Sequence, residues 1–172
     1  ERIFENTAFC LVQTEIPIET VMEACRIARK YGARTILKPV ACGVLPEQLL
    51  KNVDIIVPNA EEINAICPFE VDMDKQAQYL LEQGIDTVIV TLGADGCFVK
   101  TRKEAQYFPA VPFDVIDASG AADAFISALA TYLLNGYELY EAVRIASYAA
   151  GFSISRQGVA PSLIDKNSLE AY

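Results

Sequence analysis

Short apolar runs alternate with segments of helical periodicity along most of the chain. Each run is only a few residues long and apolar on both faces, as buried strands are. The predicted strands are 8–13, 35–37, 54–57 and 87–91, and the predicted helices are 17–31, 46–51, 59–66 and 72–83. Strands and helices in alternation are typical of a parallel sheet covered on both sides. The pattern therefore predicts an α/β protein with a three-layer α/β/α fold and a mostly parallel sheet.

The pattern changes after the fourth predicted strand. The remaining predicted elements are a turn at 93–96, a hairpin at a sheet edge over 97–100 and 105–108, and helices over 120–134 and 139–155. Both helices are rich in Ala and apolar nearly all round, which is typical of helices packed inside a layered domain. Because no internal repeat or linker interrupts the chain, residues 1–172 are predicted to form a single domain.

The composition supports a folded protein and narrows its partners. The 172 residues are 52% apolar and 22% charged, enough to bury the core of one domain. A net charge of -9 opposes binding to nucleic acid and to anionic membranes, so neither is expected as a partner. No apolar run reaches the roughly 20 residues of a spanning helix. The start, Glu1-Arg2-Ile3, is unlike a signal peptide.

Two residue types limit the chemistry. The chain contains no His, which excludes His triads, imidazole bases and His metal ligands. Its cysteines lack the C-x-x-C spacing of zinc and redox sites. We therefore expect a cytoplasmic protein with reduced and mostly buried thiols at Cys10, Cys25, Cys42, Cys67 and Cys97.

Ligands of open α/β sheets bind beyond the carboxyl ends of the strands. The candidate positions there are Glu15, 59–62, 91–96 and 117–123. The last of these leads into a helix through small residues, so its first backbone N–H groups can bind an anion such as phosphate. Asp123 lies in the first turn, where a carboxylate could take a proton from a hydroxyl that attacks the phosphate. The structural alternative is that Asp123 only complements the helix dipole and Ser119 is only an N-cap.

The same segment carries a family resemblance. Val115-Ile116-Asp117-Ala118-Ser119-Gly120-Ala121-Ala122-Asp123-Ala124-Phe125 resembles the D-T-x-G-A-G-D-x-F signature of the ribokinase-like carbohydrate kinases, the PfkB family. Further blocks of that family are similar to this sequence and stand in the same order. They are Leu37-Lys38-Pro39, Val57-Pro58-Asn59-Ala60-Glu61-Glu62, Thr91-Leu92-Gly93-Ala94-Asp95-Gly96 and Ser155-Arg156-Gln157-Gly158-Val159-Ala160-Pro161-Ser162. The resemblance covers essentially the whole chain and implies a ribokinase-like fold.

The resemblance implies a role for each matching residue. Asp123 resembles the base that deprotonates the sugar hydroxyl, and the amides of Gly120, Ala121, Ala122 and Asp123 resemble the anion hole for the migrating phosphoryl group. Asn59 and Glu62 resemble the N-x-x-E element that helps to organise Mg²⁺ and the nucleotide phosphates. An Asn N-cap followed by Glu at N3 is also a capping box, and both interpretations can hold together.

The remaining implied contacts concern the nucleotide and the sugar. Thr91, Gly93, Asp95 and Gly96 match the ATP loop, Ser147 stands near the expected adenine, and Glu15 matches a sugar contact. Taken alone, glycines after a strand more often only form a turn, and Glu15 is only a polar residue at the end of a strand.

The resemblance also implies a monovalent cation, usually K⁺, held by hard oxygen ligands. The residues at the matching positions are Asp117, Ser119, Ser153, Arg156, Gly158 and Ser162. The alternative is that Gly158 and Pro161 only mark a helix C-terminus and the loop after it.

The sequence departs from the family at three positions and in length. Ala122 replaces the Gly before the base, Ser147 replaces a frequent Asn or His, and Lys38 replaces a frequent Asn or Asp. Family members also carry a long N-terminal part with most of the sugar site, the lid and the first strands. We therefore interpret the chain as the C-terminal, nucleotide-binding portion of such a protein, with an exposed sheet edge that favours self-association.

Two functions remain open at this point. The first is ATP-dependent phosphorylation of a sugar hydroxyl, on ribose or a related sugar or nucleoside, by a longer protein that works with ATP, Mg²⁺ and K⁺ as a homo-oligomer. A kinase of a pyrimidine vitamin precursor fits the blocks around 57–59 and 155–162 less well. The second function is a non-catalytic nucleotide-binding or interaction module of the same fold.

Overall fold

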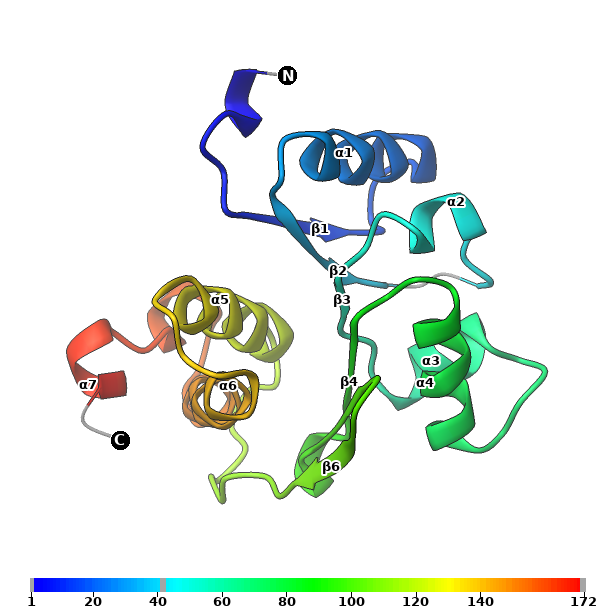
Figure 1. The fold of residues 1–172 in the computed structure, drawn as a ribbon. Helices are drawn as coiled ribbons and strands as arrows, with labels where there is room; N and C mark the ends of the chain where they lie inside the picture. Colours follow the sequence, from blue (N-terminus) through cyan, green and yellow to red (C-terminus); the bar gives the residue numbers. More distant parts are fainter. Residues whose placement is uncertain (1, 41–42, 171–172) are drawn as a thin grey trace. The chain divides into compact units, whose positions relative to one another are not determined.

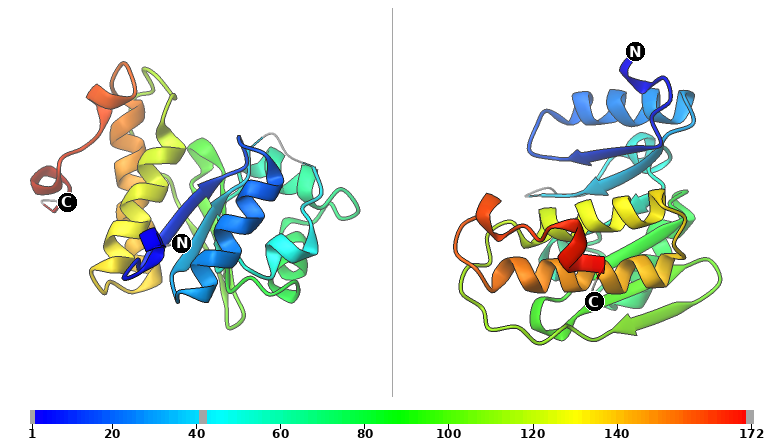
Figure 2. Two further views of the ribbon diagram at one scale, coloured as in Figure 1. Left: turned by 90° about the horizontal axis from the view of Figure 1, so that it is seen from above. Right: turned by 90° about the vertical axis from the view of Figure 1, so that its left-hand side faces the viewer.

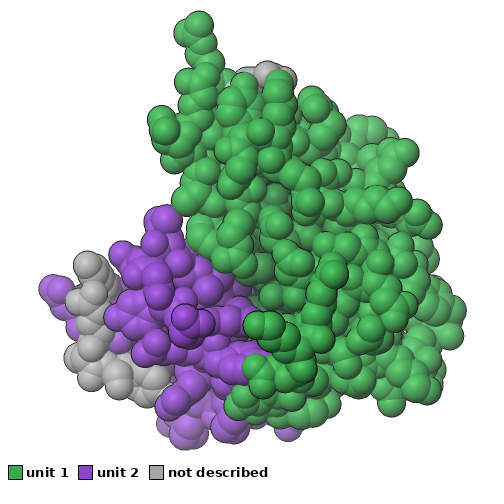
Figure 3. Space-filling view, in the orientation of Figure 1, with its two compact units in different colours: residues 1–92, 97–107 green, residues 93–96, 108–172 purple. Residues whose placement is uncertain are grey.

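The structure is a computed structural model that describes residues 2–40 and 43–170 (Figures 1 and 2). The chain forms two compact units, which Figure 3 colours separately. Unit 1 comprises Glu1–Leu92 and Cys97–Tyr107, and unit 2 comprises Gly93–Gly96 and Phe108–Tyr172. The single domain expected over residues 1–172 stays a prediction.

Unit 1 is built on a mostly parallel sheet with the strand order β1-β2-β3-β4-β5-β6. The strands are β1 (Phe9–Gln13), β2 (Arg34–Lys38), β3 (Ile55–Ile56), β4 (Thr87–Thr91), β5 (Cys97–Thr101) and β6 (Ala105–Phe108). The first four strands pair in parallel, and β5 pairs antiparallel with β4. The predicted hairpin at a sheet edge is confirmed, because β6 ends the strand order.

Four helices connect the parallel strands of unit 1. They are α1 (Ile18–Lys30), α2 (Glu47–Leu50), α3 (Ala60–Ile66) and α4 (Met73–Glu82), and a short 3-10 helix, Arg2–Phe4, precedes β1. Because each parallel strand is added next to the previous one, right-handed connections place these four helices on the same face of the sheet (Figure 1). That face carries the core of unit 1.

The residues of the central strands β2, β3 and β4 are buried on both faces. Leu37, Ile56 and Val88 lie side by side in register and belong to the apolar cluster that includes residues of α1, α3 and α4. Ile36 and Ile55, which pair with each other and point to the other face, are equally buried. The prediction of strands that are covered on both faces is therefore confirmed for β2, β3 and β4, whereas β1 is only partly buried.

Unit 2 contains two long helices that pack side by side, α5 (Ala121–Leu134) and α6 (Leu139–Ile154) (Figure 2). Buried alanines line both helices, among them Ala128, Ala142 and Ala146, and small side chains let helix axes approach closely. The turn between the helices uses Gly136 in the left-handed region, at φ 85°. The 3-10 helices Gly93–Asp95 and Ala160–Ser162 and the helix α7 (Lys166–Glu170) complete the unit.

The predicted helices and strands are all present, and each of their ends differs from the prediction by at most one residue. The sequence interpretation missed α7. A signal for it exists in Asp165, whose carboxylate accepts hydrogen bonds from the backbone N–H of Ser168 (3.1 Å) and from its hydroxyl (2.6 Å). This is the side-chain bonding that marks helix starts.

The first strand lies at the other end of the strand order, so among the described strands it pairs only with β2. Its side chains are half-buried or exposed, and Leu11 keeps 48% of its surface accessible. Exposed apolar edge strands favour pairing with another chain. Self-association through this edge stays a prediction.

The described cysteines behave as expected. Cys25, Cys67 and Cys97 are buried, Cys10 is half-buried and all four are reduced, whereas Cys42 lies outside the described residues. Burial raises the pKa of Cys25 to about 12 and that of Cys67 to about 11, so these thiols are not nucleophiles at neutral pH. Within 2–40 and 43–170, no helix combines the length and apolar character needed to cross a membrane.

Candidate functional site

In unit 2, the predicted phosphate-binding residues lie at the N-terminus of α5. Gly120 is the N-cap, in the left-handed region at φ 79°, and no side chain caps the helix there. The amide of Ala121 donates a long hydrogen bond of 3.4 Å to the carbonyl of Ala118. First-turn amides have no carbonyl partner within the helix, and Ala122 and Asp123 are exposed. The arrangement can bind an anion at this helix end.

The conformation of this turn requires glycine at position 120. A Cβ atom on Gly120 would lie 2.8 Å from Cγ1 of Val159, and its positive φ disfavours other residues. The alternative that made Ser119 the N-cap is wrong. Gly120 holds that position, and the amide of Ser119 donates to the side chain of Asp117 (2.9 Å).

Asp117 ties the turn before α5 to the loop after α6. Its Oδ1 accepts the amide N–H of Ser119, and its Oδ2 accepts the amide N–H of Gly158 at 3.0 Å. These hydrogen bonds hold the pKa of the Asp117 carboxyl below its usual value, and the bond from Ser119 contributes most. The carboxylate is therefore ionised at neutral pH and keeps lone pairs for a cation.

The other residues predicted for the cation follow α6. Ser153 and Ser162 are both buried, and their hydroxyl groups form a hydrogen bond of 3.0 Å. The Arg156 guanidinium lies over the Phe152 ring, 3.4 Å from its centre, and donates to the Phe152 carbonyl (3.3 Å). The structure thus brings together Asp117, Ser119 and Gly158, and it pairs Ser153 with Ser162. The Arg156 side chain bonds elsewhere, so its own contribution could only be a backbone carbonyl.

In unit 1, predicted site residues end neighbouring parallel strands. Thr91 ends β4, and its amide donates to the carbonyl of Pro58 (2.9 Å), which brings Thr91 next to Asn59 after β3. Asn59 and Glu62 form a capping box. Oδ1 of Asn59 accepts the amide N–H of Glu62 (2.8 Å), and Oε2 of Glu62 accepts the amide N–H of Asn59 (2.7 Å). The capping interpretation of this pair is confirmed.

A residue that the site prediction left out contacts this element. Lys38, the last residue of β2, is only 7% exposed, and its ammonium group forms an ion pair with Oε2 of Glu62. The signal was Lys38 itself, a charged residue at the end of an apolar strand and the departure from the family noted above. A buried lysine normally has a carboxylate partner.

The predicted ATP loop contains two glycines in different surroundings. Gly96 has φ 91°, and a Cβ there would lie 1.9 Å from the carbonyl oxygen of Phe108 and 2.6 Å from the amide nitrogen of Ala110. Gly93 has φ 60° with nothing within 4 Å of such an atom. Glycine is therefore required at position 96, because the backbone near Phe108 leaves no room for a side chain there. The role of Gly93, Asp95 and Gly96 in binding a nucleotide stays a prediction.

Two further predicted residues are partly or fully exposed to solvent. Ser147 is half-buried on α6, and its hydroxyl donates to the carbonyl of Val143 (2.9 Å). Glu15 is exposed in the turn after β1. Their assignments to adenine and to sugar stay predictions.

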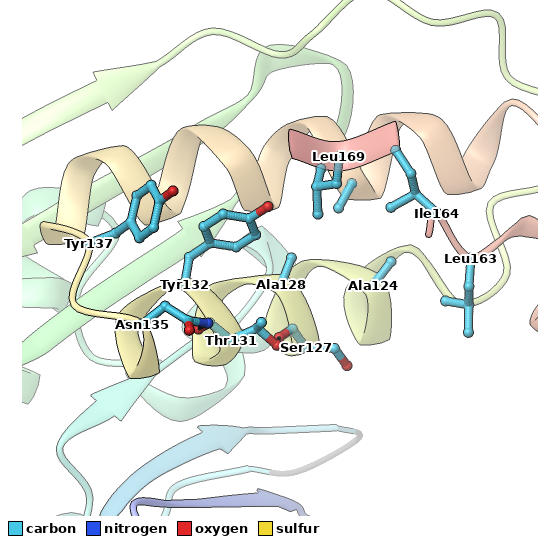
Figure 4. A pocket seen from close by; sticks show the side chains of 11 residues that line it. Ala124, Ser127, Ala128, Thr131, Tyr132, Asn135, Tyr137, Leu163, Ile164 and Leu169 are labelled. Atoms are coloured by element: carbon cyan, nitrogen blue, oxygen red, sulfur yellow. Dashed lines mark hydrogen bonds between the residues drawn. The ribbon is translucent and has the colours of Figure 1, made fainter. Parts of the chain in front are cut away.

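A cavity of about 550 Å³ runs along α5 in unit 2 (Figure 4). Polar side chains of α5, among them Ser127 and Thr131, line one side of it, and apolar residues after α6, such as Leu163 and Leu169, line another. The rings of Tyr132 and Tyr137, which also line it, meet edge to face at 4.9 Å. None of the predicted site residues lines this cavity, and the sequence interpretation did not anticipate it.

Across the part of the chain that the structure describes, no three or more Cys, Asp or Glu residues gather closely enough to hold a metal ion. Mg²⁺ commonly binds through few carboxylates together with waters and substrate phosphates, so a preformed protein cage is not required. The residues present are compatible with Mg²⁺ that arrives on a nucleotide.

The sequence and the fold are both similar to ribokinases. Ribokinase of Staphylococcus aureus (strain COL) is 32% identical over 163 residues, which are 92% of this chain and 54% of that protein. The structure of Thermotoga maritima ribokinase matches with a TM-score of 0.92 at 29% identity, covering 99% of this chain and 58% of that chain. Arabidopsis thaliana ribokinase, complexed with ribose and ATP, matches with a TM-score of 0.91 at 26% identity, covering 99% of this chain and 57% of that one.

These similarities confirm the predicted fold class, a three-layer α/β/α fold with a mostly parallel sheet. The chain spans about half the length of the curated relatives it matches. Residues 2–166 match the family described as pfkB family carbohydrate kinase. The chain therefore belongs to the pfkB family of carbohydrate kinases.

Proposed function

We propose that the protein to which this chain belongs transfers a phosphoryl group from ATP to a sugar hydroxyl, on ribose or a related sugar. The observation that carries the proposal is the start of α5, where Gly120 leaves the helix end without a side-chain cap and Asp123 lies exposed in the first turn. Membership of the pfkB family and the likeness to a ribokinase complexed with ribose and ATP support it.

In the proposed reaction, Asp123 accepts the proton of the sugar hydroxyl as that oxygen attacks the γ-phosphorus. The new oxygen–phosphorus bond forms as the bond to the β-phosphate bridging oxygen breaks, and ADP leaves. The amides of Gly120, Ala121, Ala122 and Asp123 would stabilise the charge on the transferring group, helped by the positive end of the helix dipole. Because these donors are fixed by the backbone, they need no reorganisation during transfer.

ATP supplies the phosphoryl group, and Mg²⁺ neutralises its phosphate charge. We assign Thr91, Gly93, Asp95 and Gly96 to the nucleotide loop, with Asn59 and Glu62 on the phosphate side and Ser147 near the base. Glu15 is assigned to the sugar. The exposed first-turn residues of α5 and the exposed Asp95 are consistent with ligand contacts.

We expect the 172-residue chain to bind Mg·ATP weakly and to phosphorylate no sugar. The nucleotide loop is present, whereas the sugar site and lid that the family resemblance implies belong to another part of the protein. Lids exclude water and complete such sites. Calorimetry with Mg·ATP and a coupled assay with ribose measure the two halves of this expectation, and robust ribose phosphorylation by the 172 residues would contradict it.

A non-catalytic nucleotide-binding module remains the second candidate, favoured by Ala122, which stands where the family has Gly. The methyl group of Ala122 lies in the exposed first turn of α5, beside the expected phosphate. A protein of this second kind would bind Mg·ATP yet phosphorylate no sugar even when it has the length of its relatives.

Kinase activity is expected to rise several-fold when K⁺ replaces Na⁺ at constant ionic strength. Asp117 and the carbonyls around Ser153, Arg156, Gly158 and Ser162 would hold the ion beside the turn that begins α5, with Ser119 fixed by Asp117. Asp117→Asn should make the two salts equivalent. Asp165→Asn, which removes another hydrogen-bonded carboxylate outside this cluster, should preserve the difference. Equal rates for the unmodified protein would count against the cation site.

A further inference from the structure

Lys38 places a buried positive charge at the carboxyl edge of the sheet in unit 1. Its side chain is 8% exposed and that of Glu62 is 13% exposed, and the two form an ion pair. The ammonium group also lies 3.5 Å from the carbonyl oxygen of Pro39. A buried ammonium group needs a charged partner because it has lost most of its hydration. Glu62 provides that partner.

Two oxygen atoms of the Asn59–Glu62 element, one on each side chain, already have donors. Oε2 of Glu62 accepts from the Lys38 ammonium group and from the Asn59 amide (2.7 Å), and Oδ1 of Asn59 accepts from the Glu62 amide (2.8 Å). Within the described ranges, no group of three acidic or thiol side chains offers an alternative metal site here. A divalent cation at Glu62 would have to share its carboxylate with a fixed positive charge.

The Lys38 ammonium group weakens any such binding in two ways. It neutralises the carboxylate that would attract the metal, and it repels a second cation at short range. Burial makes both effects stronger than they would be in water. A side chain of Asn or Asp at this position, as the family resemblance leads one to expect, carries no positive charge.

We propose that the Lys38 ammonium group occupies the cation position beside Glu62, so that the chain holds no divalent cation there and takes up Mg²⁺ only as the complex of its nucleotide. Lys38 is then a positioning residue that keeps the Glu62 carboxylate bonded to the start of α3. The second half of the proposal rests on the proposed kinase function, whereas the first half concerns the metal alone.

The test is a titration of the full chain with Mn²⁺ alone, with free Mn²⁺ measured by electron paramagnetic resonance. The unmodified chain and Glu62→Gln are expected to bind Mn²⁺ equally, because the Lys38 ammonium group offsets the charge of the Glu62 carboxylate and repels the metal. Lys38→Asn is expected to gain a Mn²⁺ site that binds at least about tenfold more tightly than the unmodified chain does. The double variant Lys38→Asn with Glu62→Gln should lose this new site. Circular dichroism checks that each variant is folded.

Lys100→Asn is the matched control, because Lys100 also forms an ion pair, with Asp74 at 2.7 Å, and its side chain is 13% exposed. Asp74 is 55% exposed, so the loss of its ion pair with Lys100 should create no comparable metal site. Weaker Mn²⁺ binding by Glu62→Gln than by the unmodified chain would overturn the proposal, as would a folded Lys38→Asn without the new site. If Lys38→Asn does not fold, the comparison of Mn²⁺ binding between the unmodified chain and Glu62→Gln still tests the proposal. No nucleotide is present, so failure of the kinase proposal leaves this result unaffected.

Discussion

Asp123→Asn is expected to lower kcat by about 10²- to 10⁴-fold in a kinase of the relatives' length that contains this chain. This loss corresponds to about 3 to 5 kcal/mol of activation barrier. The two side chains have nearly the same shape, so the start of α5 and the binding of Mg·ATP should survive. An amide cannot accept the proton of the sugar hydroxyl, so only the chemical step should suffer.

The structural alternative for Asp123 predicts a different result. If the carboxylate only complements the dipole of α5, the substitution should cost no more than about 1 kcal/mol of stability and leave turnover within a few-fold. Glu141→Gln provides a matched control, since Glu141 is the first-turn acid of the neighbouring helix α6 and is exposed. Measuring kcat and Tm for both variants separates the two roles, and an Asp123→Asn enzyme with near-normal kcat would exclude Asp123 as the base.

Gly96→Ala is expected to lower the free energy of unfolding by about 3 kcal/mol or more. The new methyl group would meet backbone atoms of Phe108 and Ala110 at 1.9 and 2.6 Å, and backbone atoms cannot turn aside as a flexible side chain can. The positive φ of 91° adds strain. Urea denaturation of the chain, followed by circular dichroism, measures the loss.

Gly93→Ala is the control for this prediction because it lies in the same turn. Gly93 also has a positive φ, 60°, but nothing stands within 4 Å of the added methyl group. Its cost should be limited to the backbone strain of about 1 to 2 kcal/mol. Similar losses for the two variants would mean that the contact with Phe108 does not decide the need for glycine at position 96.

The elements that the sequence predicted well are those whose pattern is local. The strand Thr87–Thr91 has the predicted ends because an apolar run stops where the turn of Gly93 and Gly96 begins. The start of α3 was predictable for the same reason, since Asn59 and Glu62 stand three residues apart and can only cap each other once a helix begins. Periodicity and caps are properties of neighbouring residues.

The contacts that the sequence did not predict join distant residues. Lys38 and Glu62 are 24 positions apart, and Asp117 and Gly158 are 41 apart. The family resemblance grouped Asp117 with Gly158, yet it left open how Asp117 bonds to its neighbours. The predicted hairpin returns the chain near Phe108 to Gly96, but it did not show that backbone atoms of Phe108 and Ala110 approach closely enough to require glycine there. Such contacts depend on the folding of the whole unit, which local patterns do not encode.

The most direct test of the proposed function uses ATP that is labelled at the γ-phosphate and measures transfer of the label to each of a panel of pentoses and nucleosides. It uses the protein that contains this chain at the length of its relatives, with Mg²⁺ and K⁺ present. We predict that the label moves to ribose or a related sugar, with one ADP formed for each sugar phosphorylated. Label that stays on ATP with every sugar, in a protein that binds Mg·ATP, would contradict the kinase proposal and identify a non-catalytic nucleotide-binding module.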